Sequence, residues 1–145
     1  MADPINRGLD ERLFQHIVES NLNAPYYQLI GIKTRALAPG RAEMVVMIDE
    51  NRHTNPLGLV HGGMYTSLAD AAMGNAVRSL GVAGVTVECS VSFLGPVSAG
   101  VELVGRGQVV KSGRNILFVE AEVWSDRLVA RAHGVFFNTG PIEVD

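Results

Sequence analysis

An aspartate and a pair of glycines lie close together in the most apolar helical stretch of the chain. The stretch reads HGGMYTSLADAAMG, in which Gly62 and Gly63 follow His61, and Asp70 comes later among leucine and alanine. Free backbone N–H groups at the start of a helix, at the positive end of its dipole, can hold an oxyanion. A carboxylate can act as a general base or as a nucleophile. The segment therefore contains the two parts of an acyl-transfer site.

The spacing between these two parts argues against a site built within one helix. Gly62 and Asp70 are eight positions apart, which is roughly 12 Å along a helix. Reacting groups have to meet within about 3 to 3.5 Å. Two antiparallel helices related by a two-fold axis could bring Gly62 of one chain to Asp70 of another. We therefore expect a homodimer with two sites at its interface.

Other common catalytic machinery is missing from the sequence. There is no G-x-S-x-G nucleophile elbow, and there is no H-E-x-x-H or paired-cysteine spacing for zinc. The four histidines are far apart in the sequence, so we expect no metal site. Cys89 alternates with apolar residues on a predicted strand, which favours a place in the core. The GRG at Gly105 lacks the third glycine of a dinucleotide-binding motif.

Length, charge and cysteine content limit the class of protein. The 145 residues suit one domain with a sizeable core. The formal net charge is -3 and the basic residues are scattered, so nothing indicates a nucleic-acid or membrane partner. A single cysteine fits a reducing compartment. The start, MADPINRGLDERLFQ, is unlike a signal peptide, and no apolar run approaches a membrane span. We expect a soluble, cytoplasmic protein.

Periodicity and helix breakers predict the elements of the first half of the chain. A helix is predicted over residues 9–21, capped by Asn6 or Asp10 and broken at Pro25. Residues 26–38 and 41–49 read as a β-hairpin joined at Pro39-Gly40. A loop follows over 50–60, and the long helix is predicted over 62–80.

The second half of the chain reads as four consecutive strands. Segment 85–93 alternates, which places Thr86 on the face opposite to an apolar set: Val85, Val87, Cys89, Val91 and Phe93. The next strand, 101–110, is weakened by Gly105 and Gly107, and KSGRN forms the turn after it. Residues 116–124 and 128–138 form the last hairpin. Antiparallel strands with one central helix predict an α+β fold, in which the long helix packs on a curved sheet.

Three segments of the sequence resemble one known family. HTNPLGLVHGGMYTSLADAAMG, GVTVECSVSFLGPV and GQVVKSGRNILFVEAEVW closely resemble the hotdog-fold acyl-CoA thioesterases, most of all their PaaI-like (phenylacetate-degradation type) branch. The resemblance covers roughly residues 26–138, and the N-x(5)-H-G-G-x(6)-D spacing is its most specific part. It implies a single hotdog domain over 1–145, with a long central helix wrapped by a curved antiparallel β-sheet and about 1–24 as a helical extension.

The resemblance also implies an assembly and a set of catalytic roles. Dimers are expected to pair into tetramers, and no cofactor is expected, because coenzyme A is part of the substrate. Asp70 is expected to activate water or to attack the thioester itself. The Gly62 N–H is expected to polarise the thioester carbonyl from the opposite subunit. Asn55 helps to fix the reacting groups, His61 lies near the thioester, and Thr86 orients water.

Substrate contacts are expected at a second group of positions. The resemblance implies that the KSGR turn contacts the phosphates and pantetheine of coenzyme A and that Phe93 lies near the nucleotide channel. Gly63 joins Gly62 at the start of the helix. The residues of the turn are Lys111, Ser112, Gly113 and Arg114. Four residues are candidates for the acyl pocket, namely Met64, Tyr65, Met73 and Asn75.

Three alternatives stay open at this point. The substrate could be the thioester of an acyl carrier protein in place of an acyl-CoA. A hotdog hydratase or dehydratase would use a differently placed histidine–acid pair, and the helix has no histidine beside Asp70. A non-catalytic acyl-CoA-binding protein would keep the pocket without needing Asp70 and Asn55, so their joint presence favours the enzyme.

Overall fold

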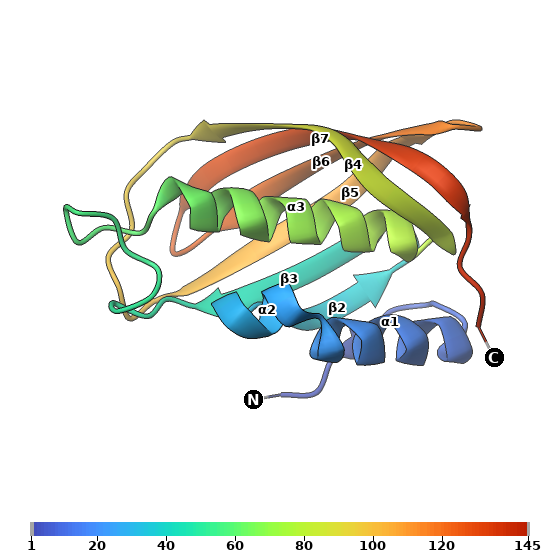
Figure 1. Cartoon of the computed structure of the whole chain (residues 1–145), viewed down its shortest axis with the longest axis horizontal. Coiled ribbons are helices and arrows are strands. Elements are labelled where there is room, and N and C mark those ends of the chain that lie inside the picture. The colour runs from blue at the N-terminus through green and yellow to red at the C-terminus, as the bar shows by residue number, and fades with distance from the viewer. Residues whose placement is uncertain (1, 145) are drawn as a thin grey trace.

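The long helix α3 (Gly62–Arg78) lies across one face of a curved, seven-stranded sheet (Figure 1). The computed structural model describes residues 2–144. No helix within these residues is both long enough and apolar enough to span a membrane. The strands are β1 (Ile5–Asn6), β2 (Lys33–Ala38), β3 (Arg41–Met47), β4 (Val82–Phe93), β5 (Glu102–Ser112), β6 (Ile116–Trp124) and β7 (Leu128–Pro141). The arrangement is the expected α+β fold.

The sheet has the order β1-β2-β3-β5-β6-β7-β4, and only β1 and β2 are parallel neighbours. After α3, the chain passes to the far edge of the sheet, where β4 pairs with β7 on one side only. The three strands that follow β4 in sequence, β5, β6 and β7, therefore separate β4 from β3. One edge of β4 stays unpaired among the described residues.

Two glycines in β5 allow α3 to lie directly on the sheet. A Cβ atom on Gly105 would lie 2.9 Å from Cγ of Leu68, and one on Gly107 would lie 2.3 Å from the backbone oxygen of Ala72. We expected these glycines to weaken a strand, and in the structure β5 runs without a break through both of them. They are the positions where the helix backbone approaches too closely for any side chain.

Apolar side chains of α3 and of the sheet form one core. Leu68, Ala72 and Met73 of α3 are fully buried against the inner face of the sheet, where Leu103 and Leu117 are also fully buried. Burying each of the larger side chains stabilises the fold by about 1.5–3 kcal/mol. The predicted acyl-pocket residues Met64, Tyr65, Met73 and Asn75 all lie within this buried interior of one chain, with at most 6% of their surface exposed.

The N-terminal segment contains two helices. Helix α1 (Glu11–Asn23) begins two residues later than predicted, because Asp10 caps it by accepting the backbone N–H groups of Arg12 and Leu13. Asn6 caps nothing; its side chain accepts N–H groups within the turn that precedes the helix.

A second short helix replaces the first part of the predicted hairpin. Helix α2 spans Pro25–Ile30, so the prediction of a strand beginning at Tyr26 was wrong. Proline is favoured in the first turn of a helix, and Gly31 ends this one at a φ of 80°. The hydroxyl of Tyr26 also hydrogen-bonds Ser67 of α3, a tertiary contact that sequence periodicity does not contain.

The predicted alternation of β4 is interrupted by a bulge. The pairing of β4 with β7 shifts between Thr86 and Glu88, so Val87 is an extra residue in the ladder. Val85 and Val87 are exposed, whereas Cys89 packs against the core. Our expectation that Thr86 lies on the face opposite to Cys89 was therefore wrong. The bulge puts both side chains on the face that carries α3.

Candidate active site

Asp70 and Thr86 form a hydrogen-bonded pair between α3 and β4. The hydroxyl of Thr86 donates to Oδ1 of Asp70 at 2.7 Å. Asp70 is half-buried and Thr86 is exposed, so the carboxylate reaches solvent while it lies on an otherwise apolar helix. A hydrogen bond to a charged carboxylate is roughly twice as strong as one between neutral groups. The pair therefore holds the carboxylate in place at the edge of the core.

The charge of Asp70 affects the pKa of the neighbouring Cys89 thiol. Burial raises the pKa of the Cys89 thiol, and the negative charge of Asp70 raises it further. Both effects disfavour the thiolate. The thiol next to Asp70 is therefore a poor nucleophile, which agrees with the expectation that Cys89 serves packing.

His61 determines how the start of α3 is built. Nδ1 of His61 accepts the backbone N–H of Gly63 at 2.8 Å, so His61 is the N-cap of the helix. The expectation that Gly63 offers a free N–H was therefore wrong. No acceptor within residues 2–144 receives the N–H of Gly62. Of the two glycines, only Gly62 has a backbone N–H without an acceptor within residues 2–144.

The ring of Phe93 lies directly over Gly62. A Cβ atom built on Gly62 would be 3.3 Å from Cε1 of Phe93, and the rings of Phe93 and Tyr65 have centroids 5.9 Å apart. Phe93 is still 56% exposed. The structure therefore brings Phe93 to Gly62, although the two residues are 31 positions apart in the sequence. The rings of Phe93 and Tyr65 lie beside the Gly62 donor.

Asn55 stabilises the loop that leads into α3. Its side-chain oxygen accepts the backbone N–H groups of Leu57 at 2.9 Å and Leu59 at 3.1 Å. No acceptor within residues 2–144 receives its side-chain NH₂ group. The oxygen is committed to the loop, and the NH₂ group is the part of Asn55 that can still donate to another molecule.

The predicted catalytic residues form two separate groups in one chain. The carboxylate group is Asp70 with Thr86, and the carbonyl group is Gly62 with His61, Asn55 and the neighbouring Phe93. No hydrogen bond, ion pair or ring contact within residues 2–144 joins the two groups. A single chain therefore does not assemble the site that the sequence predicts.

The predicted coenzyme A turn lies toward the C-terminal end of α3, away from Gly62 (Figure 1). Its side chains are exposed at Lys111, Ser112 and Arg114. The backbone N–H of Gly113 donates to Ile116 at 2.8 Å, which closes the turn. Ser112, Leu117, Phe136 and Thr86 are successive neighbours across four strands. The turn thus lies level with the carboxylate group.

A polar network beside the carboxylate group was not predicted. Asn75 donates to the hydroxyl of Tyr27 at 3.2 Å and accepts from Asn21 at 2.9 Å, and Arg78 donates to Asn21 at 2.8 Å. Burial raises the pKa of Tyr27 and lowers that of Arg78. The side chain of Asn75 is thus committed to seating α1 and α2 on α3. Polar residues on a buried helix were the available sequence signal.

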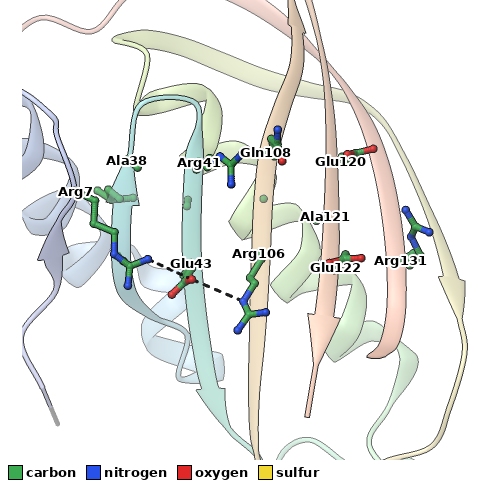
Figure 2. Close-up of a pocket in the computed structure, with 14 residues that line it drawn as sticks. Arg7, Ala38, Arg41, Glu43, Arg106, Gln108, Glu120, Ala121, Glu122 and Arg131 are labelled. Carbon is green, nitrogen blue, oxygen red and sulfur yellow. Dashed lines mark hydrogen bonds and ion pairs between the residues drawn. The ribbon is translucent and has the colours of Figure 1, made fainter. Parts of the chain in front are cut away.

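No group of three or more His, Cys, Asp or Glu side chains within residues 2–144 is arranged to hold a metal ion. The hollow drawn in Figure 2 lies on the sheet face opposite to α3 and is lined by charged side chains such as Arg106 and Glu43. It contains none of the predicted site residues.

Comparison with known proteins agrees with this architecture. Residues 57–130 match the model of the thioesterase superfamily. Acyl-coenzyme A thioesterase 13 of Homo sapiens is 28% identical over 88 residues, which are 59% of this chain and 62% of that protein. The match therefore spans less than two thirds of that relative's length.

Two solved structures have the same fold. The E. coli PaaI protein from the phenylacetic acid degradation operon has a TM-score of 0.86 and 26% identity, and the match covers 93% of this chain and 99% of that one. A hypothetical thioesterase protein from Streptococcus pneumoniae TIGR4, solved with coenzyme A, has a TM-score of 0.73 and 26% identity over 77% and 91% of the two chains. The predicted hotdog fold and its PaaI-like character are confirmed, and the chain belongs to the thioesterase superfamily.

Proposed function

We propose that this protein hydrolyses acyl-CoA thioesters to a free acid and coenzyme A, at sites shared between two subunits. The observation that carries this proposal is that one helix bears two complementary groups. These are the Asp70 carboxylate, which reaches solvent and is held by Thr86, and the Gly62 N–H, which has no acceptor within residues 2–144. Family membership, the relative named as an acyl-CoA thioesterase and the coenzyme A-bound neighbour support the same activity.

The proposed chemistry uses Asp70 as a general base. The carboxylate takes a proton from a water molecule, whose oxygen adds to the thioester carbonyl. The carbonyl oxygen becomes negatively charged and accepts the N–H of Gly62 from the partner subunit. Collapse of this intermediate breaks the C–S bond, and the proton held by Asp70 neutralises the departing thiolate. Thr86 holds one carboxylate oxygen of Asp70, so the other is left to take the proton from the water.

The unpaired edge of β4 is our proposed route to the dimer. Phe93 contacts Gly62, and Thr86 binds Asp70. The carbonyl group therefore lies beside the end of β4 at Phe93, and the carboxylate group lies beside Thr86, nearer its beginning. Antiparallel pairing of two β4 strands about Cys89 and Ser90 would set Thr86 opposite Phe93 of the partner subunit. This pairing would bring each carboxylate group to a carbonyl group of the other chain and would cover an exposed sheet edge.

The exposed turn at Lys111 and Arg114 is our proposed contact for the phosphates of coenzyme A. Both side chains are cations that can pair with phosphate, and arginine can do so with two parallel hydrogen bonds. Because the turn lies level with Thr86, it belongs to the same site as Asp70 of its own chain.

We further propose that two dimers pair through the sheet face opposite to α3, which we call the outer face. Four charged side chains form a cross-strand row there in the order Glu43, Arg106, Glu122 and Arg131 (Figure 2). The charges along the row alternate as negative, positive, negative, positive, so the row read from its other end has the opposite charge at each position. A second row, turned by a two-fold axis parallel to the strands, therefore meets it with opposite charges at each position.

Complementation between two inactive variants tests the shared site. Asp70→Asn removes the base and is expected to lower kcat at least about 100-fold. Gly62→Pro removes the backbone donor, and its ring is compatible with the first helical position and with ψ of 139° at His61. A mixed dimer of the two chains contains one intact site. Equal mixing after subunit exchange is expected to restore about a quarter of wild-type hydrolysis, since half of the dimers are mixed.

Gly62→Ala is the matched control, because it adds a carbon beside Phe93 but keeps the N–H. It is expected to retain most of the activity. Hydrolysis is measured as thiol release from a panel of short, aromatic and long-chain acyl-CoAs. Verified mixed dimers without recovered activity would contradict sharing. Acyl-CoA binding by the wild type without thiol release would instead favour a binding protein.

A further inference from the structure

His53 is a buried histidine whose two ring nitrogens both have partners. Only 2% of its surface is exposed. The backbone N–H of Asp49 donates to Nδ1 at 2.9 Å, and Nε2 lies 2.8 Å from the backbone oxygen of Ile30. None of the site chemistry described above uses this side chain.

The partners determine the protonation of the ring. A backbone N–H can only donate, so Nδ1 of His53 must carry the lone pair. A backbone oxygen can only accept, so Nε2 must carry the hydrogen. The ring is therefore neutral and held as a single tautomer, with a donor on one side and an acceptor on the other.

His53 joins three parts of the chain at the start of α3. Its ring ties the end of α2, through Ile30, to the loop that contains Asp49. Its backbone oxygen accepts the N–H of His61 at 2.8 Å. His61 in turn caps α3 by accepting the N–H of Gly63. Gly62, whose N–H has no acceptor within residues 2–144, directly follows His61 in the chain. The backbone of His53 thus links its buried ring, through one hydrogen bond, to the residue that precedes the unoccupied donor.

We propose that His53 is a positioning residue for the Gly62 donor, an inference that rests on the proposed thioesterase function. The ring is rigid and both of its bonds are buried, so it fixes the height of the His61 backbone above the sheet. A donor that stabilises a developing oxyanion must lie within a narrow distance of it, and small displacements are costly to the rate. His53 thus acts on the transition state without touching the substrate.

Two isosteric substitutions remove the ring bonds one at a time. His53→Asn can keep the hydrogen bond from the Asp49 N–H but loses the one to the Ile30 oxygen. His53→Gln can keep the hydrogen bond to the Ile30 oxygen but loses the one from the Asp49 N–H. Each is expected to lower kcat at least about tenfold while KM for the acyl-CoA stays within about twofold, because binding of the substrate precedes the use of the donor.

Arg52→Gln is the matched control. Arg52 also joins the loop to the end of α2, since it pairs with Asp49 at 3.6 Å and donates to Leu29 at 3.1 Å. It makes no bond to His61 or His53 within residues 2–144. Its variant is expected to lose some thermal stability and to keep kcat. An equal loss of kcat in the Arg52 variant would reduce His53 to a general stabilising role and overturn the proposal.

Nuclear magnetic resonance of the free protein separates this inference from the proposed function. The ¹⁵N shifts of His53 are expected to show a protonated Nε2 and an unprotonated Nδ1 in the wild type. The His53 variants are expected to shift the amide signals of His61 and Gly62 more than Arg52→Gln does. A charged ring, the other tautomer, or unmoved amides would overturn the positioning role, whether or not any acyl-CoA is hydrolysed.

Discussion

At the scale of single residues, the central observation is a carboxylate that is placed on an apolar helix and yet reaches solvent. Asp70 is surrounded in sequence by small apolar residues, which gave no hint of its partner. The bulge in β4 turns the hydroxyl of Thr86 toward it, and the hydrogen bond of 2.7 Å fixes the carboxylate. A buried acid without such a partner would be costly to the fold.

The thiol of Cys89 can be used to test how close Asp70 lies. Burial and the Asp70 charge raise its pKa above the ordinary value of 9.0, in that order of importance. Only the thiolate reacts with iodoacetamide, so the alkylation rate is expected to rise with pH through a midpoint above 9.0. Asp70→Asn is expected to move this midpoint down while leaving it above 9.0, because burial remains.

Glu88→Gln is the control for that titration. Glu88 is the next residue along β4, but it pairs at the register position of Val135 and lies on the other sheet face. Its charge is not among the causes of the Cys89 shift. The midpoint is expected to stay unchanged in this variant. A midpoint that Asp70→Asn leaves unmoved would mean that the carboxylate and the thiol are farther apart than described.

At the scale of elements, the close contact of α3 with β5 positions the site. Gly105 and Gly107 let the helix lie on the strand at Leu68 and Ala72, the part of α3 that carries Asp70. Larger residues at either position would push the helix away. The two glycines therefore serve the packing of one element on another.

Gly107→Ala tests this contact. Its Cβ would meet the backbone oxygen of Ala72 at 2.3 Å, and the backbone cannot rotate away as a side chain can. We expect a loss of about 3 kcal/mol in the free energy of unfolding, the upper end for overpacking. Gly74→Ala is the matched control on α3, where the new carbon would be 3.6 Å from Phe136.

Gly74→Ala is expected to gain about 0.5–1 kcal/mol, because alanine is the better helix former. Both values are measured by urea unfolding of the two variants beside the wild type. A Gly107→Ala variant as stable as the wild type would show that α3 can move outward at no cost.

At the scale of the whole molecule, the two surfaces that we assign to assembly have different chemistry. The free edge of β4 carries exposed apolar residues, including Val85, Val87 and Phe93. The outer face carries alternating charges, and Glu43 there already pairs with Arg7 at 3.5 Å and with Arg106 at 3.7 Å (Figure 2). The first surface suits permanent burial, and the second suits a contact that depends on salt.

Charge reversal tests the outer face. Arg106→Glu alone, or Glu122→Arg alone, sets like charges against each other in the paired rows, so tetramers are expected to dissociate into dimers. The double variant restores opposite charges at every position and is expected to restore tetramers. Sedimentation at micromolar concentration measures the change. Hydrolysis per site is expected to stay unchanged, since neither residue belongs to the site, and tetramers that survive Arg106→Glu would rule this face out.

Most of the fold could be predicted because its elements have strong periodic patterns. The long helix and the strands of the second half of the chain are formed at the predicted positions. The prediction failed at Tyr26, where a proline-initiated helix replaces a strand, and at Thr86, where a bulge reverses the faces of β4. Pro25 and Gly31 were local signals of the helix, whereas the bulge depends on the pairing of β4 with β7, which joins residues distant in sequence.

The sequence by itself determined the chemical groups that the proposed site uses, and it predicted that a second subunit completes that site. The order of residues 61–70 fixes an N-cap, a backbone donor and a carboxylate on one helix, and the rise of a helix keeps the last two apart. Only the tertiary structure decided which groups are free to act. Hydrogen bonds across the fold occupy Gly63 and the Asn55 oxygen, leave the Gly62 N–H open, and give Asp70 its partner in Thr86. Such bonds join residues far apart in the chain, and their geometry exists only once α3 is seated on the sheet.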